Sequence, residues 1–111
     1  MNLIKDIITS SYRLHTHDKT ADQAFLSVYQ TDLLSRAIKC AQPQDILITI
    51  INHINTVATA SMLFLSSVII CEDQIPTETM IKKANEADIA LISTSLKSHE
   101  VIIDLYKRGY L

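Results

Sequence analysis

The stretch between Asp45 and Glu72 most constrains the fold, because no charged residue lies between these two positions. It starts with the apolar-rich run 46–51 and ends with a second such run, 67–71. Unbroken runs of β-branched residues are typical of strands that are buried on both faces of a parallel sheet. From Ile54 onwards, apolar residues recur at helical spacing between the two runs. The stretch therefore predicts strand, helix and strand rather than a membrane span of roughly 20 apolar residues.

The helix predicted inside this stretch is amphipathic, and we expect its apolar face to lie in the core. Its N-cap is expected at Asn52 or Asn55, because asparagine side chains accept hydrogen bonds from the free N–H groups of a helix start. The residues of the apolar face are Ile54, Val57, Ala58, Ser61, Met62 and Leu65.

Strand and helix patterns also alternate along the rest of the chain. Thr31 or Asp32 is expected to cap the helix predicted at 33–41, and the hydroxyls of residues 93–95 are expected to cap the last helix. On that last helix, Asp104 should face solvent. Alternation of this kind predicts a single α/β domain over residues 1–111, with a mostly parallel sheet and helices on both faces. Further strands are predicted at 12–16, 24–29 and 89–92, further helices at 2–9, at 33–41, from Pro76 onwards and before Gly109, and a polar surface loop at 15–22.

Composition excludes several classes of protein. Hydrophobic residues make up 48% of the chain, so we do not expect disorder. Ten basic and 12 acidic residues give a net charge of −2, which argues against a nucleic-acid binder and against a polybasic membrane anchor. The single glycine rules out the glycine-rich phosphate loops of dinucleotide-binding domains and P-loop enzymes.

Targeting and redox features indicate a cytoplasmic protein. Lys5 and Asp6 interrupt the apolar residues at the N-terminus, so no signal peptide is expected. Cys40 and Cys71 lack CxxC spacing and are interpreted as reduced, buried thiols. Two histidines lie two residues apart in the segment 15–22, which is not the spacing of a helical zinc pair. We therefore expect no metal and no cofactor.

Three polar clusters, at 30–32, 52–55 and 93–95, follow predicted strands and open predicted helices. Ligands of open parallel sheets bind beyond the carboxyl ends of the strands, and helix N-termini attract anions. Two interpretations stay open: the clusters only cap helices, or they also bind a small anionic ligand. His53 is open in the same way, as a structural histidine or as a base or pH-sensitive contact.

Several segments together resemble the DRTGG domain family, which also occurs in CBS-containing pyrophosphatases and is similar to the N-terminal domain of HPr kinase/phosphorylase. The naming pentapeptide is absent, and glycines that the family usually places near Tyr29 and Asp88 are missing, although aspartate tolerates a left-handed turn. The similar segments are 29–35 (YQTDLLS), 45–49 (DILIT), 53–55 (HIN), 57–60 (VATA), 69–72 (IICE) and 92–95 (ISTS), with Pro76 and Val101.

The resemblance implies an α/β regulatory or ligand-binding module, often dimeric, without catalysis of its own. We therefore predict a non-enzymatic regulatory module that binds a small anionic ligand or nucleotide and forms a homodimer, with no catalytic residue. The alternative is a protein–protein interaction or assembly module with no small-molecule ligand. The predicted ligand-binding residues are Asp32, Ser35, Thr49, His53, Asn55, Thr94 and Ser95; Ser35 and Thr49 come from the resemblance alone.

Overall fold

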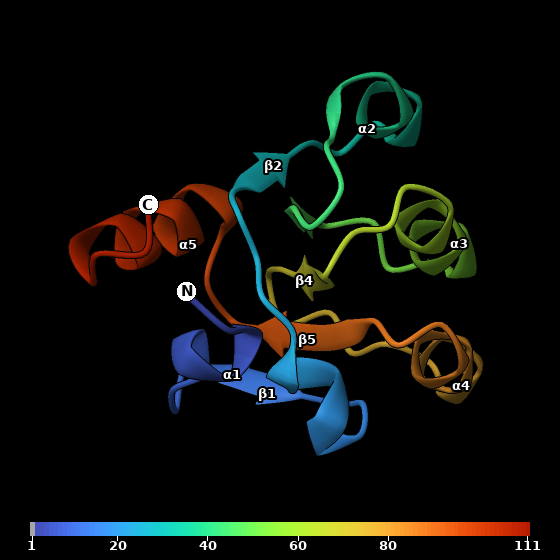
Figure 1. The fold of residues 1–111 in the computed structure, drawn as a ribbon, viewed down its shortest axis with the longest axis horizontal. Coiled ribbons are helices and arrows are strands. Elements are labelled where there is room, and N and C mark those ends of the chain that lie inside the picture. Colours follow the sequence, from blue (N-terminus) through green and yellow to red (C-terminus); the bar gives the residue numbers. More distant parts are fainter. Residues whose placement is uncertain (1) are drawn as a thin grey trace.

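The computed structural model describes residues 2–111 and contains a five-stranded sheet (Figure 1). The strands are β1 (Tyr12–Leu14), β2 (Val28–Gln30), β3 (Ile46–Thr49), β4 (Ser67–Ile70) and β5 (Ala90–Thr94). Their order across the sheet is β1-β5-β4-β3-β2. β2, β3, β4 and β5 are parallel to one another, and β1 pairs antiparallel with β5. The predicted fold class is confirmed.

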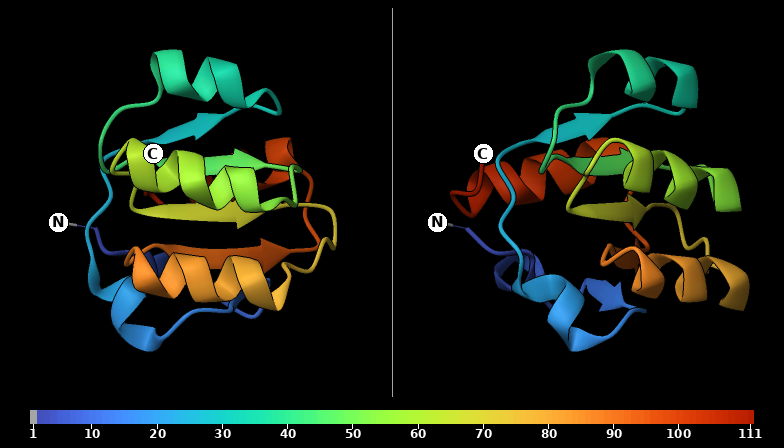
Figure 2. Two further views of the ribbon diagram at one scale, coloured as in Figure 1. Left: turned by 90° about the vertical axis from the view of Figure 1, so that its right-hand side faces the viewer. Right: turned by 45° about the vertical axis from the view of Figure 1, so that its right-hand side comes forward.

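Helices cover both faces of this sheet, as Figures 1 and 2 show. The first face carries α1 (Ile4–Ile7) and α5 (Ser98–Lys107), and the second carries α2 (Leu34–Cys40), α3 (Ile54–Met62) and α4 (Glu78–Glu86). A short 3₁₀ helix, η1 (Asp18–Asp22), follows β1. No helix within residues 2–111 is long and apolar enough to cross a membrane.

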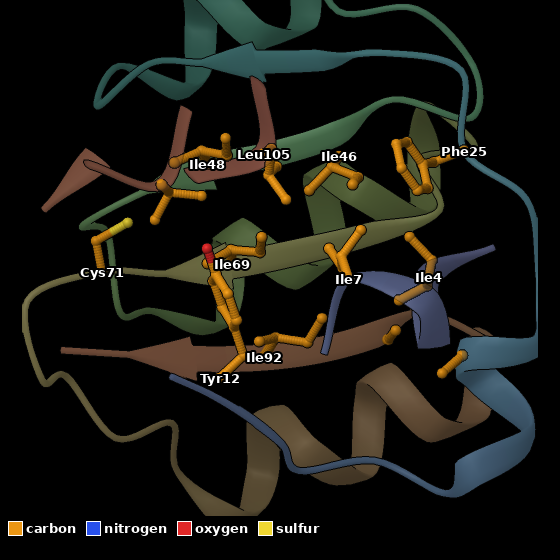
Figure 3. Packing of buried hydrophobic residues seen from close by; sticks show 13 residues of the cluster. Ile4, Ile7, Tyr12, Phe25, Ile46, Ile48, Ile69, Cys71, Ile92 and Leu105 are labelled. Atoms are coloured by element: carbon orange, nitrogen blue, oxygen red, sulfur yellow. The ribbon is translucent and has the colours of Figure 1, made fainter. Parts of the chain in front are cut away.

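The core consists of two layers, because successive strand residues point to opposite faces of the sheet. Ile46 and Ile48 join the cluster beneath α1 and α5, which Figure 3 shows, whereas Leu47 between them joins the cluster beneath α2, α3 and α4. All three side chains are fully buried. Complete burial of one such side chain contributes about 1.5–3 kcal/mol, so each central strand stabilises both layers.

Three details of the N-terminal half and of the α4 start differ from the sequence-based expectations. β2 begins at Val28 and not at 24, because Ala24 instead forms an isolated bridge with Leu3. The expected surface loop at 15–22 contains η1, in which Thr20 is buried and donates its hydroxyl to the carbonyl of His17 at 2.7 Å. Pro76 precedes the N-cap of α4 and does not lie in its first turn.

The apolar face predicted for α3 is only partly inside. Val57 is buried and Ile54 is half-buried, but Ala58, Ser61 and Met62 are exposed. The buried side of α3 is instead rotated toward its threonines: the Thr56 hydroxyl donates to the carbonyl of residue 51 at 2.8 Å, so this polar side chain can be buried without loss of a hydrogen bond. The buried residues of α3 are Thr56, Val57, Thr59 and Ala60.

Three helices end in the same backbone motif. Phe64, Asp88 and Gly109 follow α3, α4 and α5 in the left-handed conformation, with φ of 59°, 59° and 87°. In each case the next N–H group bonds the carbonyl five residues back, as in Leu65 to Ala60 at 3.0 Å. The predicted left-handed Gly109 is confirmed, and Asp88 takes this conformation without a glycine.

Asp104 was expected to face solvent, and that expectation is wrong. Its carboxylate accepts hydrogen bonds from the Tyr12 hydroxyl at 2.6 Å and from the Arg108 guanidinium at 2.8 Å. Arg108 also donates to the carbonyl of Ile7 at 2.8 Å and lies over the ring of Tyr110, 5.4 Å from its centroid. This polar network joins α5 to β1 and α1, elements that are about 100 residues apart in sequence.

Candidate functional site

The carboxyl ends of β2 and β3 bring two predicted residues, Asp32 and Thr49, into contact. The Asp32 carboxylate accepts a hydrogen bond from the Thr49 hydroxyl at 3.0 Å and another from the N–H group of Ile50 at 2.9 Å. Thr49 is fully buried, and its hydroxyl also accepts from the N–H group of Ile51 at 3.1 Å. The pair therefore closes the end of β3 and leaves only Asp32 exposed to a ligand.

His53 and Asn55 meet at the start of α3. His53 is the N-cap, and its Nδ1 atom accepts a hydrogen bond from the N–H group of Asn55 at 3.0 Å. The expectation that Asn52 or Asn55 caps this helix is wrong, because Asn52 instead donates its side-chain amide to the carbonyl of Ile75 at 2.9 Å. A protonated Nδ1 cannot accept, so the cap requires Nδ1 to be free of a proton.

Thr94 and Ser95 lie at the carboxyl end of β5. The Thr94 hydroxyl donates to the carbonyl of Ser11 at 2.7 Å and accepts from the N–H group of Leu96 at 3.2 Å. It does not cap α5, whose N-cap is Lys97, so the expected capping role of residues 93–95 is wrong. The cap expected at Thr31 or Asp32 is also wrong, because α2 begins after Leu33 without a side-chain cap.

A cavity of about 250 Å³ opens beside Thr94 and Ser95. Its walls are rich in hydroxyl groups and include one cation, Arg13, and one carboxylate, Asp73. Among residues 2–111, Arg13 forms no ion pair, so its guanidinium can bind a group that enters the cavity. The cavity is lined by Ser10, Ser11, Tyr12, Arg13, Asp73, Ile75, Ser93, Thr94 and Ser95. We call this space the β5 cavity.

Backbone conformation brings Asp73 to the β5 cavity. Glu72 and Asp73 follow β4 after one residue, Cys71, and take the left-handed conformation, with φ of 63° and 61°. Their N–H groups bond the carbonyls of Leu96 and Thr94, at 3.0 Å each, which folds the loop after β4 over the end of β5. The sequence predicted a strand at 12–16 but neither this turn nor the pairing of that strand with β5, so it did not indicate Ser10, Ser11, Arg13 or Asp73 as site residues.

The predicted residues do not form one cluster. β4 separates the Asp32–Thr49 pair from Thr94 and Ser95, which corresponds to two strand spacings of about 4.8 Å each. Asn55 instead lines a groove between α2 and α3. The remaining predicted residue, Ser35, is exposed on α2, and among residues 2–111 its hydroxyl has no hydrogen-bond partner.

Two titratable side chains near this edge are held in their neutral forms. Burial is the main cause that raises the pKa of the Cys71 thiol to about 12, and the negative charges of Asp32 and Glu72 add to it. Burial, together with the charge of Arg13, lowers the pKa of His15, whose Nε2 lies 2.7 Å from the Ser93 hydroxyl. Cys71 is therefore a protonated thiol rather than a nucleophile. Both cysteines are free, but Cys40 is only half-buried.

Comparison with known proteins supports the fold assignment. No known protein family matches this sequence, and no curated protein matches it. The fold is similar to a crystal structure of the CBS and DRTGG domains of the regulatory region of Clostridium perfringens pyrophosphatase, complexed with its activator diadenosine tetraphosphate. The TM-score is 0.69 at 16% sequence identity. The match covers 91% of this chain and 47% of that structure, so this chain spans about half of its length.

This similarity identifies the class of fold. The resemblance to the DRTGG domain that the sequence predicts is confirmed at the level of the fold, because the matched structure is a CBS and DRTGG region. The chain thus has an α/β fold similar to that of a CBS and DRTGG region, and that region of the pyrophosphatase is regulatory.

Proposed function

We propose that this chain is a regulatory module that binds a small anionic ligand or nucleotide at the carboxyl edge of its sheet. The observation that carries the proposal is the β5 cavity, which opens where ligands of parallel sheets bind and includes the predicted Thr94 and Ser95. Its free guanidinium suits a phosphate group, and its hydroxyls and Asp73 suit the sugar and base of a nucleotide.

The size of the β5 cavity limits how much of the ligand it can hold. Ordinary small-molecule sites measure about 300–1,000 Å³, whereas this cavity measures about 250 Å³. It therefore suits one part of a nucleotide, with the remainder lying over the edge toward Asp32 and the α3 start at His53 and Asn55. Binding of diadenosine tetraphosphate by the similar pyrophosphatase region supports a nucleotide as the first ligand to test.

We also propose that the module, residues 1–111, has no catalytic activity of its own and acts in the cytoplasm as a homodimer. The protonated Cys71 thiol and the use of His53 Nδ1 as a helix cap support a binding role over a catalytic one. Two free thiols suit a reducing compartment.

Isothermal titration against inorganic phosphate, AMP, ADP, ATP and diadenosine tetraphosphate tests the ligand proposal. We expect at least one nucleotide to bind, with an affinity that falls as salt is raised. Arg13→Ala should weaken binding by about tenfold or more, because it removes a charge-assisted hydrogen bond of at least about 1.4 kcal/mol. Arg36→Ala, which removes a cation from exposed α2 outside the cavity, is the matched control and should bind like wild type. Absence of binding, or equal loss in both variants, would overturn the β5 cavity as the site.

The alternative function, an interaction or assembly module without a ligand, is favoured by one observation. The exposed side of α3 carries no charge, which is unusual for a helix that faces solvent. An uncharged surface of this kind would also suit the interface of the proposed homodimer.

A further inference from the structure

The solvent side of α3 differs from that of its neighbour α4. α3 contains no Asp, Glu, Lys or Arg, and its exposed residues are Asn55, Ala58, Ser61 and Met62. α4 has a similar length but carries Glu78, Lys82, Lys83 and Glu86, all exposed. Charged side chains normally occupy the outer face of a surface helix. The exterior of α3 is therefore uncharged, unlike that of α4.

Grooves flank α3 on both sides. A groove of about 500 Å³ separates it from α4, and a second groove of about 310 Å³ separates it from α2. Ala58 and Met62 line both, so the two grooves meet along the outer side of α3. Figure 2 shows the three helices side by side on this face of the sheet.

Large apolar side chains project around these grooves. Met62 is 57% exposed and Ile38, on α2, is 49% exposed. Phe64, two residues after the end of α3, is 75% exposed and lines a separate hollow with Ser61, although its left-handed backbone conformation is one that bulky residues rarely adopt. We call the surface formed by Ile38, Ile54, Ala58, Ser61, Met62 and Phe64 the α3 face.

We propose that the α3 face is the surface on which a second copy of this chain docks about a two-fold axis. The inference rests on the proposed homodimer and names its interface. A two-fold interface uses the same patch on both subunits, so the patch must contain both projections and hollows. The α3 face meets this requirement, because the exposed side chains of Met62 and Ile38 lie along grooves that can receive such side chains. The small side chains of Ala58 and Ser61 allow two α3 helices to approach closely.

Charge also favours a second copy over an unrelated partner. The only charged residues that line the larger groove are Lys83 and Glu86, which are neighbours on α4. Their charges cancel, so the rim does not select a strongly acidic or basic partner. Across a two-fold axis, however, Lys83 can pair with Glu86 of the other copy, and Glu86 with its Lys83.

A stable dimer of ordinary size would have to bury most of this side of the molecule. A standard interface buries about 800 Å² on each partner. The molecule measures 32 × 28 × 27 Å, so one side of it spans an area of that order. The core of the interface would be apolar and uncharged, with the Lys83 and Glu86 pairs at its rim, which is the usual distribution in protein interfaces.

Sedimentation equilibrium across a range of protein concentrations tests the proposal. Wild type should show a species of twice the 12.5 kDa chain mass. Met62→Arg places an unpaired charge in the interface and should raise the dimer dissociation constant by about 100-fold or more. The matched control is Ile103→Arg, because Ile103 is similarly exposed, at 49%, but lies on α5 across the sheet. It should leave the dissociation constant unchanged.

A charge exchange provides the second arm. Lys83→Glu and Glu86→Lys should each weaken the dimer, and the double variant should restore it, because the pairs across the axis are re-formed. Circular dichroism checks that each variant is folded; if Met62→Arg is not, Ala58→Lys serves in its place. A dimer that resists these variants retains the homodimer but overturns the α3 face. A wild-type monomer at every concentration overturns both, even if the face binds a different protein.

Discussion

On one face of the sheet, side chains about 100 residues apart in sequence bind α5 to β1 and α1, whereas on the other face α3 has no such tie. Among residues 2–111, the hydrogen bonds of α3 side chains reach only to nearby positions, as from Thr56 to residue 51. The first face is therefore completed by its own polar network. The second presents grooves along an uncharged helix, which is why we propose that another molecule covers it.

The two faces also differ in titratable groups, because the polar network on the first face shifts the pKa values of its members. Burial, together with the hydrogen bond to Asp104 and its negative charge, raises the pKa of Tyr12. For Asp104, burial acts to raise the pKa, but the hydrogen bonds from Tyr12 and Arg108 outweigh it and hold the pKa below its usual value. A carboxylate that is stabilised in the folded protein ties stability to pH. The charge-free α3 offers no counterpart.

Removal of the carboxylate should produce the largest effect on stability. Asp104→Ala removes acceptors from Tyr12 and Arg108, and we expect a loss of about 2–3 kcal/mol in the free energy of unfolding at pH 7. Urea denaturation measures it. Ala58→Lys, on the opposite face, should change the unfolding free energy of the monomer by less than about 0.5 kcal/mol. Equal losses in the two variants would contradict the contrast between the faces.

The pH dependence of the same group sharpens this prediction. Because the folded pKa of Asp104 is lowered, its contribution is present above the unfolded value of about 3.9 and is lost as pH falls through the folded value. Wild type should therefore lose stability in this acidic range, and Asp104→Ala should lose less. The measurement is a series of urea midpoints at decreasing pH.

The central strands could be predicted because apolar runs such as 46–49 have only one stable place, inside a covered sheet. The orientation of α3 could not. Helical spacing shows that Ala58 and Met62 share a face with Ile54. It does not show whether that face packs against the core or against a partner. The expectation of an inward apolar face therefore rests on helical spacing alone, whereas the structure buries Thr56 and Thr59 and leaves Ala58 and Met62 exposed.

Prediction of the site had a similar limit. Local patterns located Thr94 and Ser95 at the end of β5, but Arg13 reaches the same cavity through an antiparallel pairing with residues about 80 positions away. Sequence spacing does not indicate such long-range pairing. The predictions of the N-caps were wrong for a local reason. Polar residues on each side of a turn compete for the same N–H groups, and His53 occupies the position that Asn52 or Asn55 could have taken.

A smaller effect is expected at Phe64, where the second face carries a conformational cost. Phe64→Gly should stabilise the monomer by about 1 kcal/mol, because glycine adopts the left-handed conformation without strain. Urea denaturation at a concentration that favours monomer measures it. Gly109→Ala is the inverse control: nothing lies within 4 Å of an added Cβ there, so its loss of about 1 kcal/mol would be conformational. The same Phe64→Gly variant should weaken dimerisation. If both monomer stability and dimer affinity increased, Phe64 would lie outside the interface.

The smallest effect should come from His15, which joins β1 to the α4 side of the sheet through its contact with Ser93. Burial and Arg13 lower the pKa of His15, so the unfolded chain binds a proton that the folded chain does not. Stability from this source is therefore complete above about pH 6.5 and falls as pH decreases toward the folded pKa, a window above that of Asp104. His15→Gln should reduce the loss between pH 7 and pH 5, because its amide keeps a hydrogen-bonding group near Ser93 without titrating. His99→Gln, at an exposed position on α5, is the control. If both variants changed the loss of stability between pH 7 and pH 5 equally, the effect could not be attributed to His15.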